Sequence, residues 1–196
     1  MVKLTKNELK KQKDALKRFE RYLPTLQLKK QQLQMVIRQV EQEYDNLVRE
    51  KDQLRKDLMQ WIGVFNDGID VTPYAEVEKI TTSTGNIAGI DIPVFEDLQF
   101  VDRRWDVVSM PIWVDGGIQA LRSVLQLDAQ LQVLRVQLHR LEDELRVTTQ
   151  RVNLFEKVKI PETKENIRMI RIYLGDQQTA AVVRGKIAKR NLVKAE

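Results

Sequence analysis

Two long heptad stripes, one toward each end of the chain, constrain the fold more than any other feature. The first keeps a 3–4 spacing from Leu9 to Trp61, and thirteen of its sixteen positions are apolar. The second runs from Ala120 to Phe155, with ten of eleven positions apolar. A repeat averaging 3.5 residues keeps one seam of a helix facing a partner helix in a left-handed supercoil. We therefore expect a mainly α-helical fold in which the two segments form a long antiparallel two-helix coiled coil.

The stripes divide the chain into three segments that we expect to form one structural unit. Residues 1–61 are predicted as the N-terminal coiled-coil helix, 62–117 as a connector, and 118–196 as the C-terminal coiled-coil helix. At about 1.5 Å of rise per residue, the first stripe alone would span on the order of 80 Å. The predicted molecule is a rod, and rods connect partners or transmit force more often than they catalyse.

Charge follows nearly the same boundaries. Residues 1–60 carry 15 basic and 9 acidic side chains, residues 61–115 carry 3 and 10, and residues 116–196 carry 15 and 9. The segment charges are therefore +6, −7 and +6, within a net charge of +5. In a hairpin-shaped chain this pattern predicts a different docking surface at each end. The alternative is that these charges form ordinary solvated helix faces.

The connector carries a β-hairpin pattern around residues 77–94. Two short β-favouring runs flank Ser83-Thr84-Gly85-Asn86, which predicts a hairpin that reverses at Gly85-Asn86. Pro93 indicates that the second strand is an edge strand or ends there. Gly116 and Gly117 are expected to precede the second long helix.

Two prolines indicate changes within the predicted helices. Pro24 interrupts the first stripe, but the seam continues on both sides, so we expect a kink rather than two separate helices. Ile160 precedes Pro161, which disfavours helical backbone and predicts a break or kink near residues 160–161. Helical spacing then resumes at Ile167 and Ile170.

Lys30 and Lys51 occupy positions in the first seam. Polar seam residues usually fix helix register and partner number, and we favour that interpretation for both lysines. The alternative is that they face carboxylates of a third protein.

No constellation of catalytic residues is evident in the sequence. The chain has no cysteine and no Gly-x-x-x-x-Gly-Lys-Ser/Thr phosphate loop. Its single histidine, His139, is expected to be a solvated side chain on a coiled-coil flank rather than a metal ligand. The consecutive acids Glu142, Asp143 and Glu144 point in different directions on a helix. We therefore expect a non-enzymatic chain with no cofactor and no metal.

The sequence also predicts where in the cell the protein is found. No uncharged apolar run approaches the roughly 20 residues needed to cross a bilayer. The lysine-rich N-terminus lacks the apolar core of a signal peptide. The sequence predicts a soluble, cytoplasmic protein.

Three motifs resemble sequence motifs of the D subunit, the central rotor stalk, of the V-type and archaeal-type rotary ATPases. Their order and spacing along the chain agree with that family. Residues 151–161 (RVNLFEKVKIP) are similar to a family run R-V-N-A-L-E that leads into Ile-Pro. Residues 85–93 (GNIAGIDIP) resemble the family's central hairpin motif, and residues 26–33 (LQLKKQQL) resemble its early basic stretch. The chain departs from the family pattern at Pro24, Ala88, Phe155 and Leu174-Gly175-Asp176. The resemblance covers nearly the whole chain.

The resemblance implies the central rotor shaft of such a complex, peripheral to the membrane on the cytoplasmic side. The implied partners are catalytic and regulatory nucleotide-binding subunits of a hexamer, a small central-stalk subunit, and a socket subunit that joins the membrane ring. No contact with nucleic acid and no direct membrane insertion are expected. The candidate partner-binding residues come from the basic stretches and from the family motifs: Lys10, Lys11, Lys13, Lys17, Arg18, Arg21, Asn86, Ile87, Gly89, Arg151, Asn153, Arg184 and Lys186.

Three other functions remain open at this point. The main alternative is a coiled-coil adaptor or chaperone-like arm, although such chains usually have a smaller connector. The basic stretches could bind nucleic acid weakly, but they lack interleaved aromatic residues and match no recognition motif. A membrane-surface helix would need a broader apolar face with bulky aromatics than this narrow seam provides.

Overall fold

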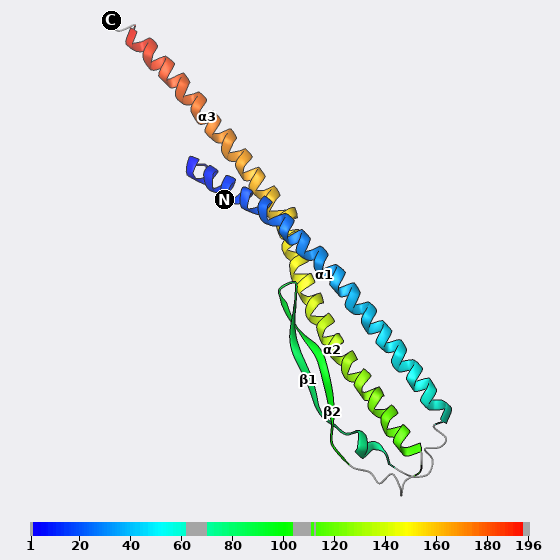
Figure 1. Cartoon of the computed structure of the whole chain (residues 1–196). Coiled ribbons are helices and arrows are strands. Elements are labelled where there is room, and N and C mark those ends of the chain that lie inside the picture. The colour runs from blue at the N-terminus through cyan, green and yellow to red at the C-terminus, as the bar shows by residue number, and fades with distance from the viewer. Residues whose placement is uncertain (1, 62–69, 104–110, 112, 194–196) are drawn as a thin grey trace. The chain divides into compact units, whose positions relative to one another are not determined.

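The computed structural model describes residues 2–61, 70–103, 111 and 113–193. These residues are mainly α-helical, with a two-stranded antiparallel sheet among them. The chain divides into two compact units, one of Met1–Lys30 with Val147–Glu196 and the other of Gln31–Arg146. In chain order, the elements in Figure 1 are α1 (Lys6–Trp61), the 3-10 helix η2 (Thr72–Ala75), β1 (Val77–Ile87), β2 (Ile90–Phe100), α2 (Trp113–Asn153), the π-helix η3 (Leu154–Lys159) and α3 (Ile160–Val193).

Helix α1 begins at a recognisable N-terminal cap. The Thr5 hydroxyl oxygen accepts a hydrogen bond from the backbone N–H of Glu8, at 3.2 Å. The Thr-x-x-Glu spacing is the capping-box pattern, which satisfies donors that the first helical turn leaves unpaired. Pro24 lies inside α1, which continues on both sides of it, so the proline does not divide the helix.

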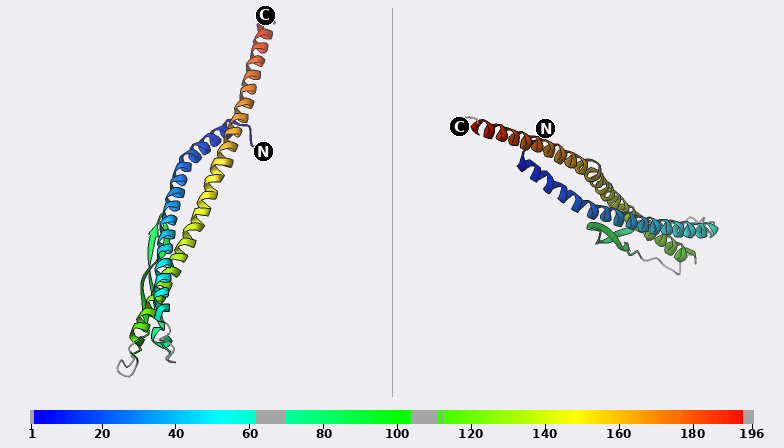
Figure 2. Two further views of the ribbon diagram at one scale, coloured as in Figure 1. Left: turned by 90° about the vertical axis from the view of Figure 1, so that its right-hand side faces the viewer. Right: turned by 90° about the horizontal axis from the view of Figure 1, so that it is seen from above.

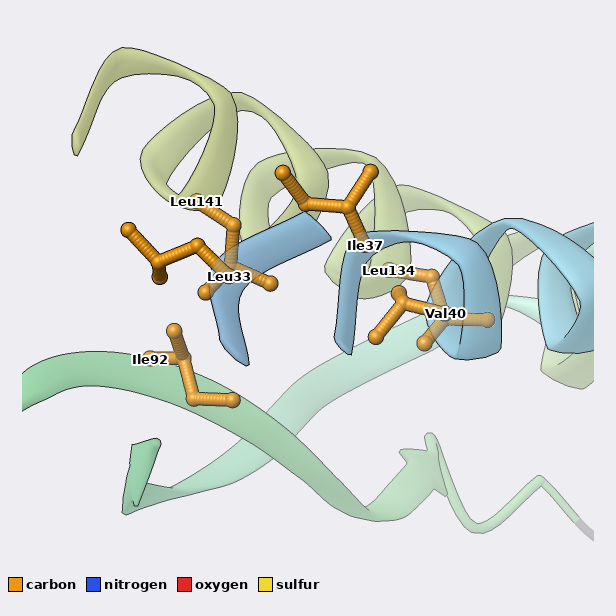
Figure 3. Close-up of a cluster of buried hydrophobic side chains, with 6 residues drawn as sticks. All are labelled: Leu33, Ile37, Val40, Ile92, Leu134 and Leu141. Carbon is orange, nitrogen blue, oxygen red and sulfur yellow. The ribbon is translucent and has the colours of Figure 1, made fainter. Parts of the chain in front are cut away.

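The unit of residues 31–146 has a core built from both helices and the sheet. Figure 3 shows Leu33, Ile37 and Val40 of α1 facing Leu134 and Leu141 of α2, with Ile92 of β2 closing the cluster. All six side chains are buried, and the five helical ones are positions of the two predicted seams. Burial of each contributes about 1.5–3 kcal/mol relative to exposure. These five seam residues therefore share one buried cluster with the hairpin, while the antiparallel coiled coil stays a prediction.

A salt bridge between the helices supports the register interpretation of Lys51. Its Nζ lies 2.6 Å from Asp128 Oδ1 of α2. Tyr44, another position of the α1 seam, accepts a hydrogen bond at 3.0 Å from Arg135 of α2 through its hydroxyl oxygen. Both polar contacts join α1 to α2 within one unit, as residues that set register do.

The predicted hairpin is present, but its turn is three residues later than predicted. Gly85 and Asn86 lie inside β1, where they pair with Ile92 and Asp91. The chain reverses at Ala88 and Gly89, whose φ angles are +53° and +79°. Two successive residues at positive φ form the tight hairpin turn that matches strand twist. The prediction was wrong because Gly-Asn is a strong turn signal, whereas alanine is a poor one at positive φ.

The sheet lies along the helices of its own unit, as the views in Figures 1 and 2 agree. Two α2 side chains hold β2 through its main chain. Gln137, which is buried, donates to the carbonyl oxygen of Pro93, and Arg140 donates to that of Asp91 at 2.9 Å. Ile92 fills the core between these two bonds. Among the described residues the sheet has two strands, so the N–H that Pro93 lacks is missing from no pairing with a third strand there.

A second set of contacts anchors the other end of the sheet. Arg122 of α2 donates to the carbonyl oxygen of Tyr74 at 2.8 and 3.0 Å, and its guanidinium lies 5.0 Å from the centre of the Phe100 ring. Thr72 opens η2 and donates its backbone N–H to Asp70 at 2.9 Å. Hydrogen bonds from the Thr72 side chain and backbone lower the pKa of Asp70 below its ordinary 3.8.

The second long helix begins earlier than expected. Helix α2 starts at Trp113, so Gly116 and Gly117 lie within its first two turns instead of preceding it. Gly117 is buried, as are Val114 and Ile118 beside it. Apolar burial at these positions compensates for the roughly 1 kcal/mol by which each glycine disfavours a helix.

The unit of residues 1–30 and 147–196 contains the change at Ile160-Pro161. Helical backbone continues there, but residues 154–159 form a π turn, in which the N–H of Ile160 donates to the carbonyl of Phe155. Proline lacks an N–H, and its ring clashes with the carbonyl four residues earlier in an α-helix. A wider turn just before Pro161 relieves both problems without ending the helix.

The π turn also corrects the register of the seam. A heptad continued from Val152 and Phe155 would bury residues 162, 166 and 169. The structure instead buries Thr163, Ile167 and Ile170, each one residue later. A π turn adds one residue to a helical turn, so it absorbs this one-residue shift. The buried Thr163 hydroxyl is satisfied by a bond of 2.6 Å to the carbonyl oxygen of Lys159.

Candidate partner-binding surfaces

The described residues hold no gathered set of ligands for a metal ion. No three His, Asp or Glu side chains come together there as a group that could bind one. His139 is 78% exposed and lies 3.5 Å from Asp143 of the next turn, in agreement with the predicted solvated side chain. None of the helices described here is long and apolar enough to cross a membrane.

The hairpin tip uses its candidate residues for its own structure. Asn86 donates to Asp91 at 2.7 Å and accepts at 3.2 Å from the backbone N–H of Gly89. Ile87 is half-buried and packs against the core cluster of its unit. Gly89 supplies the positive φ of the turn. These three residues therefore shape the tip, and the exposed side chains nearest to it are Thr84, Asn86 and Asp91.

The six basic candidates at the start of α1 are all exposed: Lys10, Lys11, Lys13, Lys17, Arg18 and Arg21. Lys13 and Lys17 are four residues apart and therefore lie on one face of the helix. Lys10 and Arg21 lie on the same side of the helix, whereas Lys11 and Arg18, seven residues apart, share another face about 130° away. Four of the six basic candidates therefore share one side of α1, and the other two cannot meet the same partner surface.

Lys13 and Lys17 line a groove between α1 and α3 with a volume of about 530 Å³. We call it the α1–α3 groove, and its two walls have matching helical spacing. The α1 wall is built from Lys13, Leu16, Lys17 and Glu20, and the α3 wall from Lys164, Ile167, Arg168, Arg171 and Ile172. The α1 set follows i, i+3, i+4 and i+7, and the α3 set follows the same spacing with one more member at i+8, so each wall is a single helix face. The structure thus brings together two predicted residues and three basic residues that the sequence analysis missed.

The missed residues carried a signal that could have been found. Lys164, Arg168 and Arg171 follow a 4–3 spacing and flank the seam residue Ile167. Basic residues beside a seam lie at the border between two paired helices, where charges from both helices meet. Because the π turn shifts the register, that border could be located only after the shift itself was known.

The remaining candidates lie apart from this groove. Arg151 and Asn153 are exposed at the end of α2, just before the π turn. Arg184 and Lys186 are exposed in α3, in a stretch where every residue from 175 to 191 is exposed. That stretch also presents apolar side chains, among them Val182, Val183 and Ile187. A helix end of mixed basic and apolar character is a surface suited to contact with other proteins.

Comparison with known proteins gives one consistent result. A family model that describes the D subunit of ATP synthase matches residues 8–190. The V-type ATP synthase D subunit of Borreliella burgdorferi is 51% identical over 193 residues, which cover 98% of this chain and 96% of that protein. The V-type ATP synthase D subunit of Chlamydia felis is 32% identical over 194 residues, covering 97% and 93% of the two chains.

Proposed function

The chain belongs to the ATP synthase D-subunit family, and from this we propose that it is the central rotor shaft of a V-type rotary ATP synthase. The shaft would transmit rotation between a nucleotide-binding hexamer and a membrane ion-translocating ring. The observation that carries the proposal is the family match over residues 8–190, joined to 51% identity with a V-type D subunit over nearly the full length of both chains.

The packing of the described residues supports a load-bearing role. Apolar seams of α1 and α2 meet the hairpin in one core, and the Lys51–Asp128 bridge resists sliding of one helix along the other. Side chains that interdigitate at close-packed density transmit strain because they have little room to move. A pair of helices held in this way, which we propose is an antiparallel coiled coil, can carry torque.

We propose that the subunit is non-catalytic and works by contact energy. ATP would be made or hydrolysed in nucleotide-binding subunits. An asymmetric shaft stabilises a different state of each nucleotide site as it turns, and differential contact is what shifts a conformational equilibrium. No catalytic group in the shaft is required for that coupling.

The proposed partners are the catalytic and regulatory subunits of the hexamer, a small central-stalk subunit, and a socket subunit next to the membrane ring. The exposed basic candidates at the start of α1, from Lys10 to Arg21, and Arg184 and Lys186 of α3 are proposed to meet other subunits. The chain would be peripheral to the membrane on its cytoplasmic side. The alternative of a coiled-coil adaptor or chaperone-like arm is not favoured, because the family match includes the hairpin as well as the helices.

Affinity purification of the tagged chain from its native cell tests this proposal. We expect two nucleotide-binding subunits at about three copies each per shaft, with ATPase activity in the purified fraction. A tagged variant with aspartate at the buried core position Leu141 is the matched control, because loss of the core should remove the whole set together. Recovery of only other coiled-coil chains would contradict the proposal.

A further inference from the structure

We propose that the α1–α3 groove binds an acidic amphipathic helix of a neighbouring subunit in the same complex. The inference rests on the proposed function, which supplies the complex. It adds a defined binding surface and the chemistry of the segment that occupies it.

The charge of the groove is strongly positive and only partly compensated within the chain. Five of its nine lining residues are Lys or Arg, and Glu20 is the single acid among them. Glu20 pairs with Lys164 at 3.5 Å, and Arg168 is held by Glu165 from outside the groove at 3.0 Å.

The other three cations have no such compensation. Among the described residues, Lys13, Lys17 and Arg171 have no ion pair or hydrogen bond from a side chain. Three uncompensated like charges around one groove repel one another, and carboxylates of a partner would relieve that repulsion.

The floor of the groove is apolar. Ile167 is buried at its base, Leu16 is half-buried, and Ile172 is 55% exposed at its rim. A ligand that supplied only negative charge, such as a nucleic-acid backbone, would leave this floor in contact with water. The combination of apolar floor and basic rim instead fits a segment with an apolar stripe flanked by carboxylates.

The shape of the groove selects a helix as the occupant. Two helix faces with i, i+3, i+4 and i+7 spacing form its walls, and a third helix packs naturally between such ridges. Acidic residues at i and i+3 or i+4 on that helix would place carboxylates opposite the two basic walls. The expected partner is therefore acidic and helical, with apolar residues at the same period.

Photo-cross-linking in the intact complex tests the identity of the occupant. p-Benzoylphenylalanine replaces Ile172 at the groove rim, and in a control it replaces Tyr173, an aromatic residue on the side of α3 roughly opposite the groove. We expect Ile172, but not Tyr173, to cross-link to a segment of another subunit with Asp or Glu at helical spacing. A cross-link from Ile172 to nucleic acid, to lipid, to this chain itself or to a segment without that acidic pattern would overturn the inference.

Charge reversal tests the electrostatic part. The double variant Lys17→Glu/Arg171→Glu changes the net charge by −4, and Arg55→Glu/Lys56→Glu makes the same change at exposed positions of α1 outside the groove. We expect the groove variant to bind its complex roughly tenfold more weakly and the control to bind within about twofold of the parent. Equal weakening of both variants would mean a general charge effect and would overturn the groove as the site.

The same experiments separate this inference from the proposed function. If the hexamer copurifies with every variant and the Ile172 cross-link lacks an acidic partner, only the groove inference fails. If no nucleotide-binding subunit copurifies with the parent chain, both fail. Circular dichroism of each charge-reversal variant should match that of the parent, because all four substituted side chains are exposed.

Discussion

At the scale of single residues, the core depends on a few seam side chains. Leu33 has no exposed surface, whereas Leu28 in the same helix is 60% exposed. We expect Leu33→Ala to lower the free energy of unfolding by about 2–5 kcal/mol, because it removes apolar contact and leaves a cavity. Leu28→Ala should change it by less than about 0.5 kcal/mol. Chemical denaturation measures the free energy of unfolding of both variants. A similar decrease in the two would contradict the assigned core.

Two glycines should respond oppositely to the same substitution. Gly89 has a φ of +79° in the hairpin turn, whereas Gly175 lies inside α3 with no neighbouring atom within 4 Å of the point where a Cβ would stand. We expect Gly89→Ala to destabilise by about 1–2 kcal/mol, because alanine resists positive φ. Gly175→Ala should stabilise by about 0.5–1 kcal/mol, because alanine favours a helix. Thermal unfolding measures the change in melting temperature for each variant. Changes of the same sign would refute the backbone conformation assigned to one of the two glycines.

At the scale of elements, the π turn predicts where the chain tolerates a deletion. Removing the exposed Glu156 together with Pro161→Ala should give a continuous α-helix, since the seam would then return to an unbroken heptad. Removing the exposed Glu142 from α2 should instead turn the following seam residues away from their partners by about 100°. We expect the first variant to keep a melting temperature near that of the parent and the second to lose much of its stability.

Circular dichroism during heating measures the melting temperatures of the two deletion variants and of the parent chain. A control with Pro161→Ala alone isolates the effect of the proline. If the two deletions lower the melting temperature equally, the π turn does not set the register of the seam.

The elements were predictable from sequence to different degrees for physical reasons. The long helices followed from apolar periodicity, which depends on the burial of whole faces and survives a single Pro24. The reversal at Ala88-Gly89 did not, since Ala88 adopts a positive φ that alanine disfavours, in a turn where Ile87 and Ala88 pack against the core. Tertiary packing overrode a local turn preference there.

The candidate surface was predicted only in part for a related reason. Lys13 and Lys17 stood out as members of a basic run along the chain. Their groove partners Lys164, Arg168 and Arg171 follow 147 to 158 residues later and become neighbours only through helix pairing. No pattern within one segment contains that information, so the groove required the structure.

At the scale of the whole molecule, the proposed function predicts rotation that can be seen directly. The chain has no cysteine, so Thr82→Cys on the exposed face of β1 adds a single attachment site. The experiment uses a complex whose other subunits carry no reactive cysteine and whose hexamer is fixed to a surface. We expect a bead attached to the new cysteine to turn in one direction when ATP is added. The parent chain should hold no bead.

Video microscopy with and without ATP makes this measurement. ATP hydrolysis with only random fluctuation of the bead would refute a rotor role for the chain, even if it copurified with the complex.

The bonds from Gln137 and Arg140 to β2 end on main-chain carbonyl oxygens. Every amino acid carries the same carbonyl, so these anchors do not depend on which side chains the strand bears. Over evolutionary time, the outward-facing positions of the hairpin can therefore drift without loosening its attachment to α2. A lineage whose partner subunits change can adjust this face by single substitutions, while the helical core that supports it stays the same.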